Sequence, residues 1–405
     1  MPTSLLTNEQ SIFVFLLALV GAAFAMGRVK RFERFFHFFP PLIFCYFLPM
    51  IATTAGITPA ESPLYGWFSS FFLPPILFLL LISADPRSIA RLGPVAVGVM
   101  LAGTTGIVLG AVSGYALFSG ALPEGAWKGI GALAGSWSGG SANMVAVKQS
   151  FEIPDDQFAL LLIVDSVMVY SWMGVVIALA AYQQAWKQRF GVNEALTKRL
   201  EAAVEHFEQQ KREPATTDGV LISLALAIGL GYLTIVAGRE VHHQLGRAGL
   251  FDAYPTLKSL SAGTITVMLI TVVGVVCSFL PAVRRLEDQG ASRLGYALLF
   301  LLLPMYGAQA NLAQIGKTPY FAAVGACMIA GHVAMLLVAM RLWRTPLFFG
   351  AVGSQANMGG PASASVVAAT YQPALAPVGV LLGVLGGIMG TYVGLLTGYL
   401  CSLVG

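Results

Sequence analysis

The sequence predicts an all-α polytopic membrane protein built from two inverted repeats. Three observations predict this fold: the composition, a glycine pattern that occurs twice, and the placement of lysine and arginine. The chain has 405 residues, 57% apolar and 10% charged, with a mean hydropathy of +0.76. Soluble domains carry about 25% charged residues. The net charge of +4 lies in loops, so it does not indicate a nucleic-acid partner.

The charged residues are segregated, which leaves apolar segments long enough to cross a bilayer core of about 30 Å as helices of ~20 residues. The weak ten-residue alternation of a membrane barrel is absent. We therefore expect spans at 11–27, 37–57, 65–84, 93–118, 157–183, 217–237, 259–281, 293–314, 319–340 and 375–402. Two further apolar segments, 128–150 and 345–371, are interrupted in the middle by Gly, Ser, Asn or Pro.

These two interrupted segments carry the same pattern. Residues 139–174 and 359–394 align without a gap at a shift of 220 residues, and eight of 36 positions are identical, including the Gly-Gly pair that opens each stretch. We therefore expect a first repeat over 1–183 and a second over 217–405. The linker between them, 184–216, is polar, and its segment 193–212 is typical of an amphipathic helix.

The distribution of lysine and arginine favours re-entrant hairpins over crossing helices. If both interrupted segments are hairpins and both termini lie outside, 17 Lys and Arg residues face the cytoplasm and 6 face outward. If both segments cross, the split is 11 against 12. Cytoplasmic loops are enriched in these residues, so we expect ten spans plus two hairpins, with the linker in the cytoplasm. A broken helix that crosses the membrane is the alternative. Five spans per half would invert the second repeat relative to the first.

The hairpin tips contain the candidate ligand-binding groups. A polar, glycine-rich interruption in each half of a membrane protein indicates a transport site, because irregular backbone survives in the bilayer only inside protein or beside a wet cavity. Freed carbonyls and side-chain oxygens can coordinate Na⁺, and half-helix N-termini can face an anionic solute. Close helix packing by small residues is the structural alternative. The candidates are Ser136, Ser138, Gly139, Gly140, Ser141, Asn143, Ser354, Gln355, Asn357, Gly359, Gly360 and Ser363.

Three candidates lie outside the tips. Asp165 is a deep acid in the 157–183 span, where it could bind Na⁺, carry a proton, or form a structural hydrogen bond. Gln309 and Asn311 follow Pro304 in the 293–314 span and could add neutral oxygen ligands, or mark an ordinary polar helix end. We expect Na⁺ ligands among Asn143, Asp165, Asn357 and Ser363. His332, in an apolar span, is interpreted as a hydrogen-bonded interior histidine rather than a proton relay.

Other chemistries lack a sequence pattern. There is no P-loop, no nucleophile elbow and no zinc-protease helix in the sequence, so we expect no enzyme activity and no ATP-driven transport by this chain. The four cysteines are scattered without metal-ligand spacing and are interpreted as packing residues. We therefore expect no cofactor beyond Na⁺ or H⁺ as a coupling ion.

At the Gly-Gly-Ser-Ala-Asn and Gly-Gly-Pro-Ala-Ser motifs the chain resembles an uncharacterised bacterial membrane-protein family, domain-of-unknown-function 819 (YjcL-like), over most of its length. That family is similar to a superfamily of cation–proton antiporters, bile-acid and glutamate symporters and citrate-type carriers. The resemblance implies inverted repeats, a mobile core with hairpins, a stationary scaffold and a homodimer. Citrate-type carriers also have glycine pairs in two hairpin tips, but this chain shows no conspicuous arginine beside either tip.

From these observations we expect an ion-coupled secondary transporter of a small polar solute in the bacterial cytoplasmic (inner) membrane, with Na⁺ favoured over H⁺. Its partners would be the small-molecule substrate, membrane lipid and a second copy of the chain. The hairpins and the spans 157–183, 293–314 and 375–402 should form the moving core, and the other spans the scaffold. An Na⁺/H⁺ antiporter, and a non-transporting receptor or channel-like module, are the alternatives.

Overall fold

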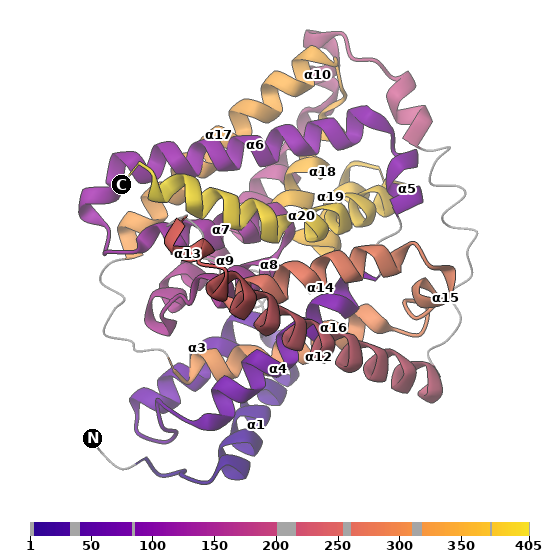
Figure 1. Cartoon of the computed structure of the whole chain (residues 1–405). Coiled ribbons are helices and arrows are strands. Elements are labelled where there is room, and N and C mark those ends of the chain that lie inside the picture. The colour runs from indigo at the N-terminus through magenta and orange to yellow at the C-terminus, as the bar shows by residue number, and fades with distance from the viewer. Residues whose placement is uncertain are drawn as a thin grey trace.

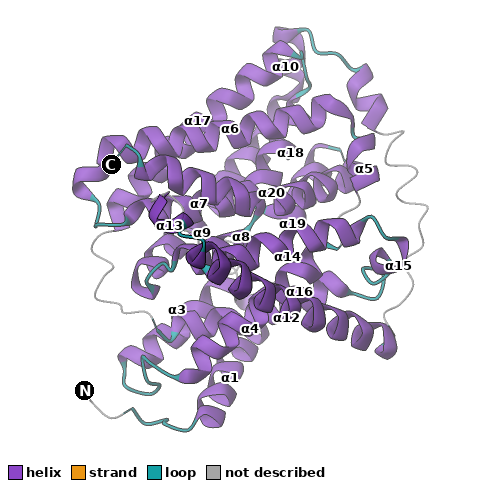
Figure 2. Cartoon of the chain, in the orientation of Figure 1, coloured by secondary structure: helices purple, strands orange, loops and turns teal. Residues whose placement is uncertain are grey.

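The computed structural model describes residues 4–32, 41–82, 86–200, 216–253, 261–309, 318–372 and 375–404, and within these ranges it contains helices and loops but no strand (Figure 2). Among the described residues, seven helices are long and apolar enough to cross a membrane. Three shorter apolar helices, at 44–54, 262–278 and 291–307, coincide with the predicted spans 37–57, 259–281 and 293–314. The chain is therefore a polytopic helical membrane protein, as its composition predicted.

Each half of the chain folds into the same order of helices. The first half contains α1 (Glu9–Gly27), α3 (Pro41–Thr54), α4 (Pro63–Leu81), α6 (Gly93–Phe118), α7 (Ala126–Gly139), α8 (Ser141–Phe151) and α9 (Asp155–Ala178). The second contains α12 (Thr217–Arg247), α14 (Ala262–Ser278), α16 (Ala291–Gly307), α17 (Thr318–Leu342), α18 (Leu347–Met358), α19 (Gly360–Tyr371) and α20 (Ala376–Ser402).

Helix α12 is longer than predicted. The apolar stretch ends near residue 237, but the helix continues to Arg247. A hydrogen bond of 2.8 Å from Gln244 to Glu240, four residues apart, supports the polar extension, since such pairs stabilise exposed helices. The helix then stops before Gly249, whose φ of +68° ends it in the left-handed region.

The linker begins against the loop between α17 and α18. In α10 (Gln183–Phe190), Trp186 donates to the Thr345 carbonyl at 3.1 Å, and the guanidinium of Arg341 lies over the Phe190 ring. The end of α9 and the end of α17 therefore lie on the same side of the molecule. Of the predicted amphipathic helix at 193–212, residues 195–200 are helical, and the rest lies outside the described residues.

Both interrupted segments are helical hairpins. In the first, α7 and α8 close at their base, where the rings of Trp127 and Phe151 lie 5.2 Å apart. In the second, α18 and α19 close through Phe348 and Tyr371, with 6.4 Å between ring centroids. The chain reverses at Gly140 (φ +94°) and at Gly360 (φ +72°), a conformation that only glycine adopts without strain. The hairpins favoured by the charge count are therefore present.

Helix α20 lies along both hairpins, which approach it from opposite ends. A Cβ added to Gly394 would lie 2.8 Å from the Gly131 carbonyl oxygen, and one added to Gly390 would lie 2.8 Å from that of Gly135. At the other end, a Cβ on Gly379 would collide with the Ala364 carbonyl. The bases of the two hairpins thus lie at opposite ends of α20, and their tips meet near its middle, at Gly386.

The helices form two layers (Figure 1). The core layer consists of the two hairpins with α6, α9, α17 and α20, and the scaffold layer of α1, α3, α4, α12, α14 and α16. Helices α6 and α17 cross at backbone contact, because Gly106 and Gly110 face Gly331 and Cys327. Small residues at such spacing let membrane helices approach closely.

The layer assignment corrects three predictions. The 293–314 span was expected in the moving core, but α16 packs in the scaffold, with Gly307 against the Tyr46 backbone and the ring centroids of Phe300 and Phe24 4.9 Å apart. The spans 93–118 and 319–340 were expected in the scaffold, but α6 and α17 pack against the hairpins. Hydropathy indicates which segments lie in the membrane. Which helices pack against one another depends on the shapes of their surfaces.

The glycine contacts predict a specific loss of stability. Gly394→Ala should place a methyl group against the Gly131 backbone and lower the stability by about 1–3 kcal/mol, as overpacking does. Gly229→Ala is the matched control, because nothing lies within 4 Å of its added Cβ and alanine favours a helix by roughly 1 kcal/mol. Thermal unfolding of the purified variants in detergent measures both. Equal melting temperatures would contradict close packing between α7 and α20.

Candidate functional site

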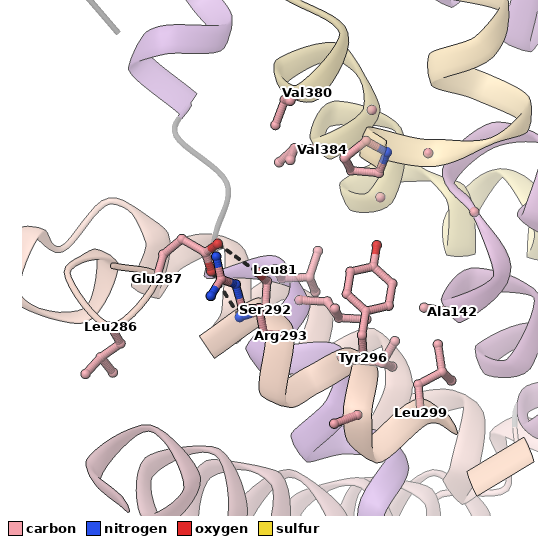
Figure 3. Close-up of a pocket in the computed structure, with 18 of the residues that line it drawn as sticks. Leu81, Ala142, Leu286, Glu287, Ser292, Arg293, Tyr296, Leu299, Val380 and Val384 are labelled. Atoms are coloured by element: carbon pink, nitrogen blue, oxygen red, sulfur yellow. Dashed lines mark hydrogen bonds between the residues drawn. The ribbon is translucent and has the colours of Figure 1, made fainter. Parts of the chain in front are cut away.

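A cavity of about 1860 Å³ lies between the core and scaffold layers, and the two hairpin tips form part of its wall. The tip residues that line it are Gly139, Gly140, Ser141, Asn143, Gly359 and Gly360. Leucines of α4 and α16 form the opposite, scaffold wall, and Tyr296 projects from α16 into the space between the layers (Figure 3). Opposite the tips the scaffold wall is therefore apolar, whereas its charged residues, among them Arg284, Arg285 and Arg293, lie at the 281–293 end of the cavity.

The two tips are in contact. A Cβ built on Gly140 would lie 4.0 Å from the Gly360 Cα. Behind this point, Gly386 of α20 faces the backbone oxygens of both Ser138 and Ala356. Helices α8 and α19 begin at the tips without a side-chain cap, so their first backbone N–H groups are available to a ligand. The positive ends of two helix dipoles thus meet at one wall of the cavity.

Asn143 fixes the first tip to α20. Its side-chain amide donates to the Gly139 carbonyl at 2.9 Å, and its oxygen accepts from the Thr391 hydroxyl at 2.6 Å. Because Asn143 and Thr391 both line the cavity, this hydrogen bond lies directly beside any bound molecule. Asn143 is therefore both a wall residue and a structural clamp.

Asp165 supports the first hairpin from behind. One carboxylate oxygen accepts from the Ser136 hydroxyl at 2.7 Å and from the Trp137 indole at 2.9 Å. The carboxylate is buried and does not line the cavity. A buried carboxylate needs such donors, since an unpaired charge is costly in an apolar environment. Asp165 is thus connected to the cavity wall only indirectly, by its hydrogen bonds to Ser136 and Trp137 in the last turn of α7.

Asn357 holds the second hairpin to α6. Its amide donates to the Met100 carbonyl at 2.9 Å, and its oxygen accepts from the Thr104 hydroxyl at 3.1 Å. The side chain is fully buried and is not part of the cavity wall. With these partners Asn357 anchors the hairpin, and its role as a Na⁺ ligand stays a prediction.

A second buried network lies one turn earlier on α18. The Ser354 hydroxyl contacts a ring nitrogen of His332 at 2.8 Å and accepts from the Trp172 indole at 2.8 Å. The other His332 nitrogen lies 2.9 Å from the Gly103 carbonyl. His332 therefore has a hydrogen-bond partner at each ring nitrogen and links α6, α17 and α18.

Five of the predicted residues remain. Ser138 and Gln355 are fully buried at the tips, and their side-chain polar atoms have no hydrogen-bond partner among the described residues. Ser363 is half-buried and donates to the Gly360 carbonyl at 3.3 Å. Gln309 donates to the Met305 carbonyl at the end of its own helix. It lies far from the tips, because the neighbouring Tyr306 contacts Gln149 near the base of the first hairpin. Asn311 lies outside the described residues.

Sequence reasoning missed the partners of these residues. Thr104 and Thr391 are hydroxyl residues in apolar spans, and Trp137 and Trp172 donate through buried indoles. Only Thr391 carried a signal, because it aligns with Ser171 in the repeat. Among the described residues no cluster of His, Cys, Asp or Glu could hold a metal ion.

The base of the first hairpin contacts the scaffold through a buried lysine. The Lys148 ammonium lies 3.0 Å from an Asp155 carboxylate oxygen and 4.0 Å from the centroid of the Tyr306 ring of α16. Tyr46 of α3 donates to the Asp155 carbonyl at 2.9 Å, and Thr264 of α14 donates to that of Ser150 at 2.8 Å. The layers are thus joined by polar contacts at the side opposite the 281–293 loop.

The fold and the paired tips define the class: a polytopic α-helical membrane protein of two inverted repeats, with hairpin tips that wall a cavity between layers. Over residues 14–403 the chain matches the family described as "Protein of unknown function (DUF819)", and it belongs to that family. It is similar to the uncharacterized membrane protein YjcL of Bacillus subtilis (strain 168), at 25% identity over 331 residues, which cover 79% of this chain and 78% of YjcL. The family resemblance is thereby confirmed, whereas membership of the wider superfamily stays a prediction.

The Lys148 contacts predict a charge effect on stability. Lys148→Met keeps the length of the side chain but leaves the Asp155 carboxylate without its cation, which should cost about 3 kcal/mol. The double variant Lys148→Met with Asp155→Asn should recover most of this loss, because neither side chain is then charged. Thermal unfolding in detergent measures the three proteins. If the double variant is no more stable than the single one, the ion pair is not the origin of the effect.

Proposed function

We propose that this protein is a cation-coupled secondary transporter of a small polar organic solute, with Na⁺ as the coupling ion. One observation carries the proposal: two hairpins from opposite ends of α20 meet at its middle and wall a cavity there. Inverted repeats with broken helices that meet near the midplane are the geometry of alternating access. A solute bound at the tips could be reached from either side by a modest movement.

The tips favour a polar solute with hydrogen-bond acceptors. They supply uncapped helix N-termini, the Ser141 hydroxyl and the Asn143–Thr391 pair. The cationic residues of the lining, Arg284, Arg285 and Arg293, lie at the 281–293 end of the cavity together with Glu287, Asp288 and Asp218. Backbone N–H groups and neutral side chains therefore recognise the solute, and no arginine clamps it.

The side on which the cavity opens follows from the charge count. The cavity extends to the 281–293 loop, and the predicted orientation assigns this loop to the cytoplasm. At the opposite side, contacts of Lys148, Tyr46 and Thr264 join the core layer to the scaffold layer and close the cavity. With this orientation, the structure corresponds to an inward-open state.

The mode of movement that fits these contacts is an elevator. The tips are fixed within the core layer by Asn143, Asn357 and Asp165, whereas Leu77, Leu81 and Leu299 form the facing scaffold wall. The apolar part of the wall that faces the tips makes no directional contacts, so the core can slide along it as one body. A homodimer formed through the scaffold, which would keep that layer stationary, is part of this proposal.

A proton-coupled mechanism is the second candidate. Asp165 is a buried carboxylate in a span and bonds directly to the last turn of α7, so its protonation would change how the first tip is held. Na⁺/H⁺ exchange without an organic solute would use the same group. A receptor or channel-like module would show neither solute counterflow nor ion-driven uptake.

Transport by reconstituted protein tests the proposal. Solutes are first screened by thermal stabilisation of the purified protein with amino acids, amides, polyols and carboxylates, in NaCl and in choline chloride. The solute that stabilises it is then followed in counterflow. Asn143→Ala should lower uptake at least tenfold, because the clamp beside the solute is lost. Thr370→Ala, on the exposed face of α19, should transport at the wild-type rate. Equal rates in both variants would contradict the site.

Accessibility of single cysteines tests the orientation. In a background without the four native cysteines, Glu152→Cys should react with an impermeant maleimide from outside the cell, and Thr370→Cys only after the membrane is opened. Both positions are exposed at the bases of the two hairpins. Labelling of both from the same side would contradict the inverted arrangement in the membrane.

A further inference from the structure

A buried amide without a partner marks a second site, distinct from the cavity. Gln355 lies in the last turn of α18 and is fully buried. Neither its side-chain oxygen nor its side-chain nitrogen has a hydrogen-bond partner among the described residues. A buried polar group left unsatisfied costs about 1–3 kcal/mol, so native proteins rarely keep one without a bound water or ion.

The gap beside this amide exists because residue 359 is glycine. A Cβ added to Gly359 would collide with both the Gln355 amide nitrogen and the Ser363 hydroxyl. These two groups, one from each arm of the hairpin, therefore flank the same gap. Ser363 also donates to the Gly360 carbonyl at 3.3 Å. Because the two ends of a glutamine amide are assigned and not observed, either the oxygen or the nitrogen of Gln355 can face the gap.

The groups around the gap suit a monovalent cation. With the amide oxygen turned inward, Gln355, Ser363 and the Gly360 carbonyl present neutral oxygen atoms, which hard cations prefer. The negative end of the α18 dipole lies beside them. The described part of the chain places no group of three or more His, Cys, Asp or Glu that could hold a metal ion, which disfavours a divalent ion.

We propose that Na⁺ binds inside the second hairpin, between Gln355 and Ser363, directly behind the cavity wall. This inference rests on the proposed function and deepens it. Gly359 and Gly360 line the cavity, so an ion that joins α18 to α19 fixes the backbone that the solute contacts. Asn143, Asn357 and Asp165 already have protein partners, which leaves Gln355 as the tip side chain with both polar atoms unused.

Sodium-dependent thermal unfolding of the purified full-length protein tests the site. The melting temperature is measured against NaCl, with choline chloride keeping the ionic strength constant. The wild type should show a saturable rise. Gln355→Leu should remain at least as stable without Na⁺, because an unpartnered amide is replaced by an apolar group of similar size, but its rise should disappear. Ser363→Ala should raise the half-saturating Na⁺ concentration at least tenfold, and Thr370→Ala should behave as the wild type.

The outcomes separate this site from the transport proposal. A Gln355→Leu variant that keeps the wild-type Na⁺ response overturns the site, and so does a wild type that does not respond to Na⁺. Either result leaves counterflow of a solute to be judged by itself. Conversely, a Na⁺ response that depends on Gln355 and Ser363, in a protein that exchanges no solute, supports the ion site and contradicts the transporter.

Discussion

The backbone contact between α20 and the two hairpins is the constraint on which the rest of the structure depends. Glycines along α20 bring the carbonyls of Gly131, Gly135 and Ser138 within a distance that a methyl group would prevent. In a bilayer no hydrophobic driving force separates helices from lipid, so close packing by small residues supplies the association. The tips can meet only because α20 lets both hairpins lie against it.

Once the tips are placed, polar residues divide into those that hold them and those that face a ligand. Asp165, Asn357 and Ser354 bond to groups deep in the core layer, whereas Asn143 and Ser141 line the cavity. Each holding group satisfies donors or acceptors that would otherwise be unpaired away from water. In the core layer the strongly polar residues are therefore mostly structural, and the part of the cavity wall formed by the tips consists of backbone and small side chains.

The repeats share a fold but not their chemistry. Asp165 aligns with Leu385 and Lys148 with Ala368, and His332 lies outside the aligned stretches. The first hairpin is thus supported by a carboxylate and the second by an imidazole. Among the residues that the structure describes, the buried Lys148–Asp155 pair has no counterpart at the second hairpin base. The two hairpins therefore differ in the polar groups that hold them, although both follow the same path along α20.

The sequence by itself determined the spans, the two hairpins and the family, because hydropathy reports burial in the bilayer and glycine pairs report where a helix must break. It also singled out Asn143 and Gln355 as polar groups at the tips. Only the tertiary structure decided that α16 belongs to the scaffold, that Asn357 faces Thr104, and that Gln355 lacks a partner. Those facts depend on helix rotation and on contacts between residues 180 to 260 positions apart, which a hydropathy pattern does not encode.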